Sequence, residues 1–385
     1  MDCEPNPGLG PRKRSQNEPW ASESVVRLEA RLPTITGMVE RVLLAEPRGF
    51  CAGVEMAIKA LTWMVRIFEP PVYCYHEIVH NEWVVGAFER VGVTFVNDIS
   101  EVPEGAPVML SAHGSSPEVV EGAGARAAVV IDAVCPLVTK VHHEVKRMAS
   151  KGYDILYVGH QGHDEAVGTV AEAPEAITLV EPETGLAAFH PKDPGRVALL
   201  AQTTLGMHEW RQVLEQAESQ FPALETARRS DLCYATTNRQ DAVGQLAQQC
   251  DLILVVGSDN SSNTQALVRY SIENGTPAYR VDAADRIDPA WLEGVDVVGV
   301  TAGASAPDHL VQEVIDRLDP AQGFELWQST TEAEYFPLPP QLRNFVSTLS
   351  ALVLAGVTAR PSSEPGWLDQ DRDWTATEAL KLIST

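Results

Sequence analysis

The sequence predicts an α/β protein with mainly parallel sheets and three similar lobes. Short apolar runs alternate with amphipathic stretches along the chain, which is the pattern of strands joined by crossover helices. Small or polar residues follow each run, where the expected strands end. Three cysteines, Cys51, Cys135 and Cys233, stand at comparable separations, each just before a helical pattern. We therefore expect each lobe to bring one cysteine to the start of a helix.

The expected lobes span residues 41–135, 136–232 and 233–330. Residues 1–40 are rich in Pro, Ser, Glu and Arg without periodicity, which predicts a disordered N-terminal tail. Met38 stands just before the first expected strand and is an alternative start. Residues 331–385 begin with a proline-rich stretch and are expected to form a loosely attached C-terminal extension of unknown role.

The strands and helices follow from local patterns. After Cys51 and after Cys135, apolar residues recur at helical spacing, and Pro136 suits a first helical position. Thr236 or Thr237 is expected to cap the third such helix. In open parallel sheets ligands bind beyond the carboxyl ends of the strands, so the site should lie there. The expected strands are residues 42–45, 72–75, 108–110, 129–131, 155–158, 197–200, 252–256 and 297–300.

Composition narrows the function classes. The chain has 385 residues, of which 44% are hydrophobic and 21% charged, as in ordinary globular proteins. A formal charge of −24 argues against binding to nucleic acid or to an anionic membrane surface. No apolar stretch has the length of a membrane span, and no signal segment stands at the N-terminus. We therefore expect a cytoplasmic protein, in which cysteines are metal ligands, redox groups or core residues rather than disulfides.

The three repeated cysteines have the context of metal ligands. The positive end of a helix dipole stabilises a thiolate and is expected to lower the thiol pKa. Three thiolates, rather than four, would leave one iron of an iron-sulfur cluster open to substrate. The alternative is that they are buried core residues, as cysteines often are. We assign Cys3, Cys74 and Cys250 to the tail or to packing.

Polar residues at the expected strand ends describe a cup that could bind a diphosphate without Lys or Arg. Hydroxyls, amides, imidazoles and backbone N–H groups at helix starts would be the donors. Residues of these types also form ordinary turns, and single histidines are often structural. The residues concerned are His80, His113, His163, Thr203, Ser261, Ser262, Asn263 and Ser305.

Glu165, two residues after His163, is a candidate proton donor, and Thr203 is its candidate relay partner. A carboxylic acid in an enclosed site can have its pKa raised towards the working pH. The alternative is a solvent-facing acid in the first turn of a helix, a common place for Asp and Glu. The residues alone slightly favour the solvent-facing interpretation.

The segment His76-Glu-Ile-Val-His80 matches the H-E-x-x-H pattern of zinc peptidases. That pattern needs both histidines on one face of a helix. Here the segment follows the strand-like run 70–75, and we expect the next helix to begin only near Asn81. The match is therefore interpreted as accidental, and a zinc hydrolase built on His76 and His80 is the alternative enzyme class.

Taken together, the motifs resemble those of the 4-hydroxy-3-methylbut-2-enyl diphosphate reductase family. The resemblance is in chain order and covers roughly residues 41–318. It rests on Pro47-Arg-Gly-Phe-Cys-Ala-Gly53, His76-Glu-Ile-Val-His-Asn81, Ser111-Ala-His-Gly114, Cys135-Pro-Leu-Val-Thr-Lys-Val-His142, Gly159-His-Gln-Gly-His163, Gln202-Thr-Thr-Leu205, Cys233-Tyr-Ala-Thr-Thr-Asn-Arg239, Asn260-Ser-Ser-Asn263 and Thr301-Ala-Gly-Ala-Ser-Ala-Pro307.

The resemblance implies the last step of the methylerythritol phosphate route to isoprenoids. An allylic hydroxyl is removed to give isopentenyl and dimethylallyl diphosphates. The implied fold is three α/β lobes in pseudo-threefold arrangement around one 4Fe-4S cluster per chain. By position Cys51, Cys135 and Cys233 would be its ligands, and one iron would stay open. Glu165 would be the proton donor, and the eight cup residues would bind substrate.

The resemblance also implies an external one-electron donor such as ferredoxin or flavodoxin, which the acidic surface would repel unless a local basic patch exists. The sequence departs from the family in the run His163-Asp-Glu-Ala-Val-Gly168, where members often have Pro after the histidine and a second Glu before the glycine. A cluster-bearing sensor that kept the fold is the non-enzymatic alternative. The retained Glu165 and the complete cup argue against it.

Overall fold

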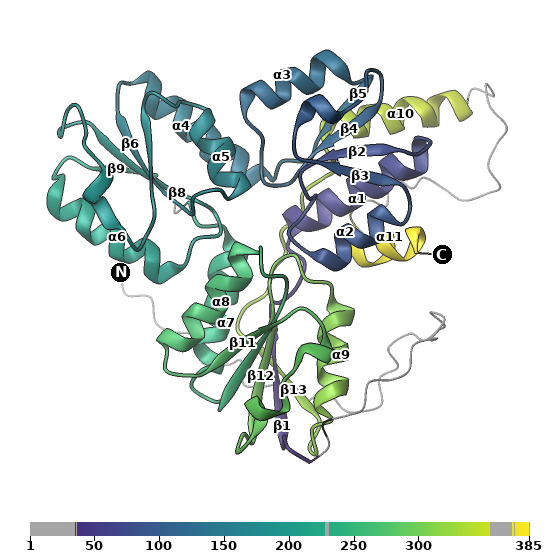
Figure 1. Cartoon of the computed structure of the whole chain (residues 1–385), viewed down its shortest axis with the longest axis vertical. Helices are drawn as coiled ribbons and strands as arrows, with labels where there is room; N and C mark the ends of the chain where they lie inside the picture. The colour runs from purple at the N-terminus through teal and green to yellow at the C-terminus, as the bar shows by residue number, and fades with distance from the viewer. Residues whose placement is uncertain (1–34, 36, 228–230, 355–371, 373, 385) are drawn as a thin grey trace.

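The structure is a computed structural model that describes residue 35 and residues 37–227, 231–354, 372 and 374–384. Within these ranges the strands form three sheets, and every strand pair is parallel. Figure 1 shows the three lobes grouped around a common centre. The predicted α/β class with three lobes and parallel sheets is therefore confirmed.

Lobe 1 contains the sheet β3-β2-β4-β5 and the helices next to it. Helix α2 begins where the sequence predicts, because the Asn81 side chain caps it by accepting a hydrogen bond from Val84 N at 3.1 Å. The elements are α1 (Ala52–Ile67), β2 (Val72–Tyr75), α2 (Glu82–Glu89), β3 (Val93–Val96), the 3₁₀ helix Ile99–Glu101, β4 (Pro107–Leu110), α3 (Pro117–Arg126) and β5 (Val129–Asp132).

Lobe 2 repeats this plan with the sheet β7-β6-β8-β9. Its central strand β8 is buried at every position, as expected for a parallel strand covered on both faces. The elements are α4 (Pro136–Ser150), β6 (Asp154–Val158), α5 (Asp164–Ala171), β7 (Ile177–Val180), the 3₁₀ helix Gly185–Ala188, β8 (Val197–Ala201), α6 (Met207–Gln220) and β9 (Glu225–Thr226).

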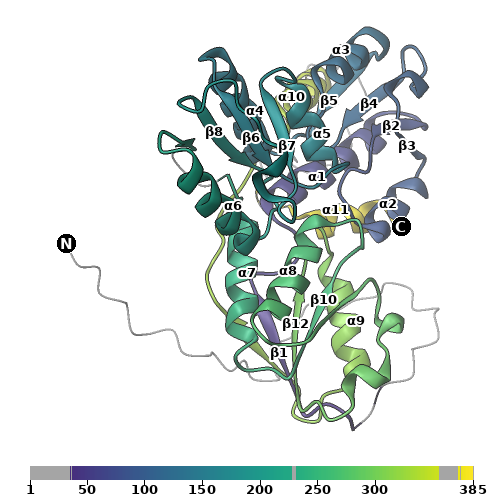
Figure 2. The same ribbon diagram turned by 60° about the vertical axis from the view of Figure 1, so that its left-hand side comes forward.

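Lobe 3 contains the sheet β11-β10-β12-β1-β13. It includes a strand from the start of the fold, and Figure 2 shows this strand among those of the later chain. The elements are β1 (Arg41–Glu46), α7 (Tyr234–Leu246), β10 (Leu252–Val256), α8 (Ser262–Glu273), β11 (Ala278–Val281), the 3₁₀ helices Ala284–Arg286 and Pro289–Leu292, β12 (Val297–Ala302), α9 (Asp308–Leu318) and β13 (Phe324–Gln328).

Strand β1 departs from the predicted division, which places residues 41–46 in lobe 1. It pairs with β12 on one side and β13 on the other. Its side chains alternate between two cores of lobe 3, with Val42 and Leu44 in one and Leu43 and Ala45 in the other. Burial on both faces requires a central position in a sheet, and lobe 3 provides it. The chain thus enters lobe 1 only with α1.

The C-terminal residues differ more strongly from the expectation of a loosely attached extension. Helices α10 (Pro340–Leu354) and α11 (Ala376–Ile383) contribute buried side chains to the core of lobe 1, including Leu342 and Leu380. Figures 1 and 2 both place α11 beside α1 and α2. The prediction is wrong here because the apolar faces of both helices have a partner surface that sequence reading could not identify.

The structure also bears on the predicted N-terminal tail, the predicted helix cap and the expected lack of a membrane span. Most of residues 1–40 lie outside the described residues, but Ile35 and Val39 are buried in a core of lobe 3. Thr236 and Thr237 do not cap α7, because that helix begins at Tyr234 with Cys233 as its N-cap. None of the helices in the described ranges combines the length and apolar character needed to cross a membrane.

Candidate active site

One cavity lies where the three lobes meet, and it brings together every site residue predicted from the sequence. The lining also includes Phe336, which comes from the segment after lobe 3. The predicted residues in the lining are Cys51, His80, His113, Cys135, His163, Glu165, Thr203, Cys233, Ser261, Ser262, Asn263 and Ser305.

Each cysteine of the cavity is the N-cap of a helix: Cys51 precedes α1, Cys135 precedes α4 and Cys233 precedes α7. The Cys233 sulfur accepts a hydrogen bond from Thr236 N at 3.3 Å. Gly53 lies so close that a Cβ there would be 2.8 Å from the Cys135 sulfur. A side chain at position 53 would therefore fill space beside the thiols, which explains the glycine.

The thiol pKa values run against the sequence expectation. Burial raises the pKa of Cys51 and of Cys135, and it raises the pKa of Cys233 to about 11. Backbone N–H groups at the helix starts lower each pKa, but desolvation outweighs them. The helix dipole alone therefore does not make thiolates here, and a bound metal would have to displace the protons itself.

The cysteine set fits an iron-sulfur cluster better than a single ion. A tetrahedral zinc with bonds of about 2.3 Å would hold its sulfur ligands roughly 3.8 Å apart. The three cysteine sulfurs are not among the described groups whose ligand atoms all lie within 4.8 Å of one another. Soft thiolates spread around a cavity suit a larger iron-sulfur unit. Among the described cysteines Cys74 and Cys250 lie in other cores, so the cavity offers three.

The histidines form a compact group on the side of the cavity that belongs to lobes 1 and 2. The His80 and His113 rings stack with centroids 3.8 Å apart, and the His163 ring meets His80 edge-on at 5.2 Å. Burial, together with the neighbouring imidazoles, lowers the pKa of His113 well below its usual value and that of His163 to about 3. Both rings are neutral at neutral pH, and an anion placed between them would favour protonation.

Glu165 lies in the first turn of α5 and is only 2% exposed, so the solvent-facing alternative is wrong. Its carboxyl group accepts two hydrogen bonds from Thr203, one from the backbone N–H at 2.6 Å and one from the hydroxyl at 2.8 Å. Burial raises its pKa to about 7, against the lowering effect of these bonds. A neutral, buried carboxylic acid facing a cavity is suited to donate a proton.

The remaining cup residues come from lobe 3. Ser261 caps α8 and accepts a hydrogen bond from Thr264 N at 3.3 Å. The Asn263 side chain accepts one from Ala304 N at 2.9 Å, and the Ser305 hydroxyl donates to His80 O at 2.8 Å. The last bond joins lobe 3 to lobe 1. Amides and hydroxyls of lobe 3 therefore face the histidines across the same cavity.

The zinc-peptidase pattern has the wrong local geometry. Residues 76–80 form a non-helical segment before α2, and His76 has a φ of 58°. His76 bonds to Asp164 whereas His80 stacks on His113. The two histidines therefore do not share a helical face, as the sequence predicted.

The structure adds contacts that the sequence did not indicate. Arg239, completely buried, donates to Gly49 O at 2.7 Å and pairs with Glu332 at 2.9 Å, so the segment after lobe 3 is bonded to the loop before Cys51. Asp164 pairs with His76 at 2.7 Å between lobes 2 and 1. No periodicity or motif marks such pairs, because each partner comes from a distant part of the chain.

Comparisons with known proteins agree with this architecture. Residues 42–319 match the family model described as LytB protein. A protein of Mycolicibacterium paratuberculosis named 4-hydroxy-3-methylbut-2-enyl diphosphate reductase is 48% identical over 309 residues, which is 79% of this chain and 93% of that protein. The Mycobacterium leprae protein of the same name is 48% identical over 333 residues, covering 85% of this chain and 97% of the relative.

A solved structure, the E-1-hydroxy-2-methyl-but-2-enyl-4-diphosphate reductase from Plasmodium falciparum, superposes with a TM-score of 0.78 at 33% identity. It covers 81% of this chain and 99% of its own. Fold and sequence thus agree with the resemblance found in the motifs. The chain belongs to the LytB family, in which its curated relatives are named 4-hydroxy-3-methylbut-2-enyl diphosphate reductases.

Proposed function

We propose that this chain is an oxidoreductase that removes the hydroxyl group of 4-hydroxy-3-methylbut-2-enyl diphosphate. The reaction takes two electrons and two protons and gives isopentenyl or dimethylallyl diphosphate and water, the last step of the methylerythritol phosphate route. The names of relatives at 48% identity support this substrate. The observation that carries the proposal is the meeting of three cysteines from the helix starts of three lobes with a buried acid of pKa about 7.

Cys51, Cys135 and Cys233 would hold a 4Fe-4S cluster in this cavity. When bound, it supplies electrons singly and the Lewis acidity of an iron without a cysteine ligand. The chain's contribution is the enclosure: the half-buried cysteines stand at helix starts, and Gly53 leaves room beside the Cys135 sulfur. The free thiols are protonated at neutral pH, so cluster assembly releases protons.

Glu165 is the proposed proton donor to the leaving hydroxyl oxygen, which departs as water. With a pKa of about 7 the carboxyl group is protonated in a large fraction of molecules at neutral pH. Thr203 orients it, since its N–H and hydroxyl contact the two carboxyl oxygens. The backbone contact keeps the carboxyl group in place in both protonation states.

The diphosphate is proposed to lie between the histidines and the lobe 3 residues. His80, His113 and His163 face this space from lobes 1 and 2, and the start of α8 faces it from lobe 3. Because two of these rings have lowered pKa values, the anion would be bound first by neutral donors and then by imidazolium as protons are taken up. Ser261, Ser262, Asn263 and Ser305 complete the polar lining.

The remaining partner is a one-electron donor, for which we propose ferredoxin or flavodoxin. Both are themselves acidic, and this chain has a formal charge of −24, so encounter should be slow at low ionic strength unless a local basic surface receives the donor. The described cysteines are all free, which suits the reducing cytoplasm. We propose no nucleic acid and no membrane as partners.

The test is anaerobic purification followed by iron and acid-labile sulfide analysis, with visible spectra before and after adding the allylic diphosphate. We expect about four iron and four sulfide per chain, a spectral change on ligand addition, and reductant-dependent conversion to the two diphosphate products. Cys135→Ser should lose iron, whereas Cys74→Ser, a change in the lobe 1 core, should keep it.

A chain that binds zinc instead and remains colourless after reconstitution would contradict the proposal. A stable cluster without turnover under any reductant would support the sensor alternative and equally reject the enzyme. The two failures are distinguished by the metal analysis, which does not depend on activity.

A further inference from the structure

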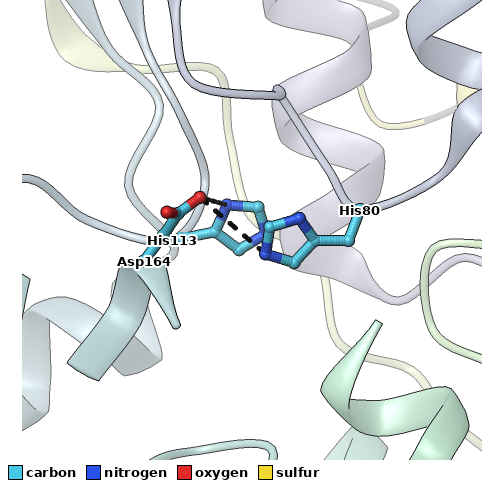
Figure 3. A group of neighbouring side chains, drawn as sticks. All are labelled: His80, His113 and Asp164. Atoms are coloured by element: carbon cyan, nitrogen blue, oxygen red, sulfur yellow. Dashed lines mark ion pairs between the residues drawn. The ribbon is translucent and has the colours of Figure 1, made fainter. Parts of the chain in front are cut away.

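Asp164 is one of two carboxylates that pair with the histidine group; the other is Glu77, whose Oε2 lies 3.2 Å from His80 Nδ1 within lobe 1. It is the first residue of α5, between His163 and Glu165, and it belongs to lobe 2. One of its oxygens lies 2.7 Å from His76 Nδ1 of lobe 1. Its other oxygen lies 3.7 Å from His113 Nδ1 and 3.9 Å from His80 Nε2. Figure 3 marks both ion pairs with dashed lines. The carboxylate therefore touches lobe 1 at the edge of the space assigned to the diphosphate.

This position needs an explanation, because a carboxylate beside a bound diphosphate repels it. The ion pair with His76 would cancel the negative charge of Asp164 and so remove this repulsion. The hydrogen bond from Asp164 raises the pKa of His76. Burial raises the pKa of Asp164, but the hydrogen bond and the positive charge from His76 outweigh it, so the net pKa is lowered. The two form a hydrogen-bonded pair in which both pKa shifts favour imidazolium and carboxylate, whose charges cancel.

His76 is itself firmly held. Its backbone φ of 58° lies in the left-handed region, which residues other than glycine rarely adopt. The hydrogen bond from His76 N to Val96 O at 2.8 Å fixes the backbone there. Its ring stacks on Tyr75 with centroids 4.1 Å apart. A side chain fixed by its own strand end is a good anchor for a contact from another lobe.

A second contact shows that α5 lies against lobe 1 over more than its first residue. A Cβ at Gly168 would be 3.2 Å from Gly114 O, in the loop that follows His113. The middle of helix α5 therefore approaches the backbone of lobe 1 closely at Gly168. The start of the helix forms the ion pair between Asp164 and His76. The first turn contains Glu165 and is capped by His163.

We propose that Asp164 is a positioning residue for diphosphate binding: its ion pair with His76 fixes the first turn of α5 and His163 against His80 and His113 of lobe 1. This inference rests on the proposed function, since it takes the histidine group as the diphosphate site. Asp164 does not touch the reacting atoms in this scheme. It acts by holding His163 of lobe 2 in position relative to His80 and His113 of lobe 1, and its pair with His76 adds no net charge.

The test compares Asp164→Ala and Asp164→Asn with the unaltered holoprotein. The probe is inorganic diphosphate, with its Kd measured by calorimetry, alongside KM and kcat for the allylic diphosphate. A charge-assisted hydrogen bond is lost in the alanine variant, so we expect Kd and KM to rise by about 10-fold or more, with a smaller change in kcat. Asparagine can still accept from His76 and should recover part of the loss.

Two further variants sharpen the result. His76→Asn suits the left-handed backbone and should reproduce the loss seen in Asp164→Ala, and the double variant should be no worse than either single one. Glu172→Ala is the control, because it removes a carboxylate at the other end of α5 that pairs only within lobe 2, with His142 at 2.9 Å and with Lys146 at 2.8 Å. Its Kd for inorganic diphosphate should be unchanged.

An unchanged or tighter Kd in Asp164→Ala would overturn the inference, since it would mean that the carboxylate only repels the anion. Additive losses in the double variant would equally overturn it. If the unaltered protein binds inorganic diphosphate but never converts the allylic diphosphate, the proposed function fails while the comparison of Kd values still decides the role of Asp164.

Discussion

Two sides of the same cavity reach electrical neutrality by opposite routes. On the side of Glu165, burial raises the pKa of the carboxyl group to about 7, so an acid keeps its proton. On the histidine side, burial lowers the pKa of His113 and of His163, so bases lose theirs. Desolvation favours the uncharged form in each case. The comparison teaches that burial alone can keep a carboxylic acid protonated as a proton donor. The same burial keeps the histidines neutral until an anion binds beside them.

The largest effect should come from removing the acid. Glu165→Gln keeps the size of the side chain but cannot deliver the proton, so turnover should fall by about 100-fold or more while diphosphate binding changes little. Steady-state kinetics with direct binding measurements would check this. Glu175→Gln, an exposed acid of the same lobe, is the control and should behave as the unaltered protein. Unchanged turnover in Glu165→Gln would remove this residue from the mechanism.

Substitutions among the histidines should change KM rather than kcat. His113→Asn removes a ring that stacks on His80, and KM should rise by about 10-fold while kcat changes less. The exposed His143→Asn on α4 is the matched control. A fall in kcat with constant KM would show that the two sides are not separate, and the comparison would fail.

The pH dependence should separate the two sides without mutation. Glu165 must be protonated to act, so kcat should fall as pH rises through about 7, approaching about tenfold per unit beyond it. Neutral histidines with lowered pKa values should instead take up protons when the diphosphate binds. Calorimetry at pH 7 in buffers of different ionisation enthalpy would detect that uptake. Proton release on binding would contradict the neutral resting state.

The smallest expected effect is a shift in the pH dependence of kcat when Thr203, which orients Glu165, is substituted. Thr203→Val removes the hydroxyl that donates to Glu165 but keeps the backbone contact, so the charged form of the carboxyl group loses one stabilising bond. Its pKa should rise further, and the fall of kcat should move to higher pH. A pH–rate profile of the variant would show the displacement. An unshifted profile would mean that the hydroxyl does not contact the acid during turnover.

The site was largely predictable because its residues follow local rules. The residues predicted for the cavity stand in the loops that follow apolar strands or at helix starts, and parallel sheets collect such positions at one edge. Asp164 occupies the same kind of position, yet its partner His76 could not be inferred. Contacts between lobes depend on the relative placement of rigid units, about which periodicity says nothing. Phe336 was missed for the same reason.

The sequence by itself determined the parallel strand–helix plan, the placement of Cys51, Cys135 and Cys233 at helix starts, and the family, because each depends on residues that are close in the chain. Only the tertiary structure decided that β1 joins lobe 3, that α10 and α11 cover lobe 1, and that burial raises the thiol pKa values. Strand pairing and desolvation arise between distant segments, and neither exists until the lobes have assembled.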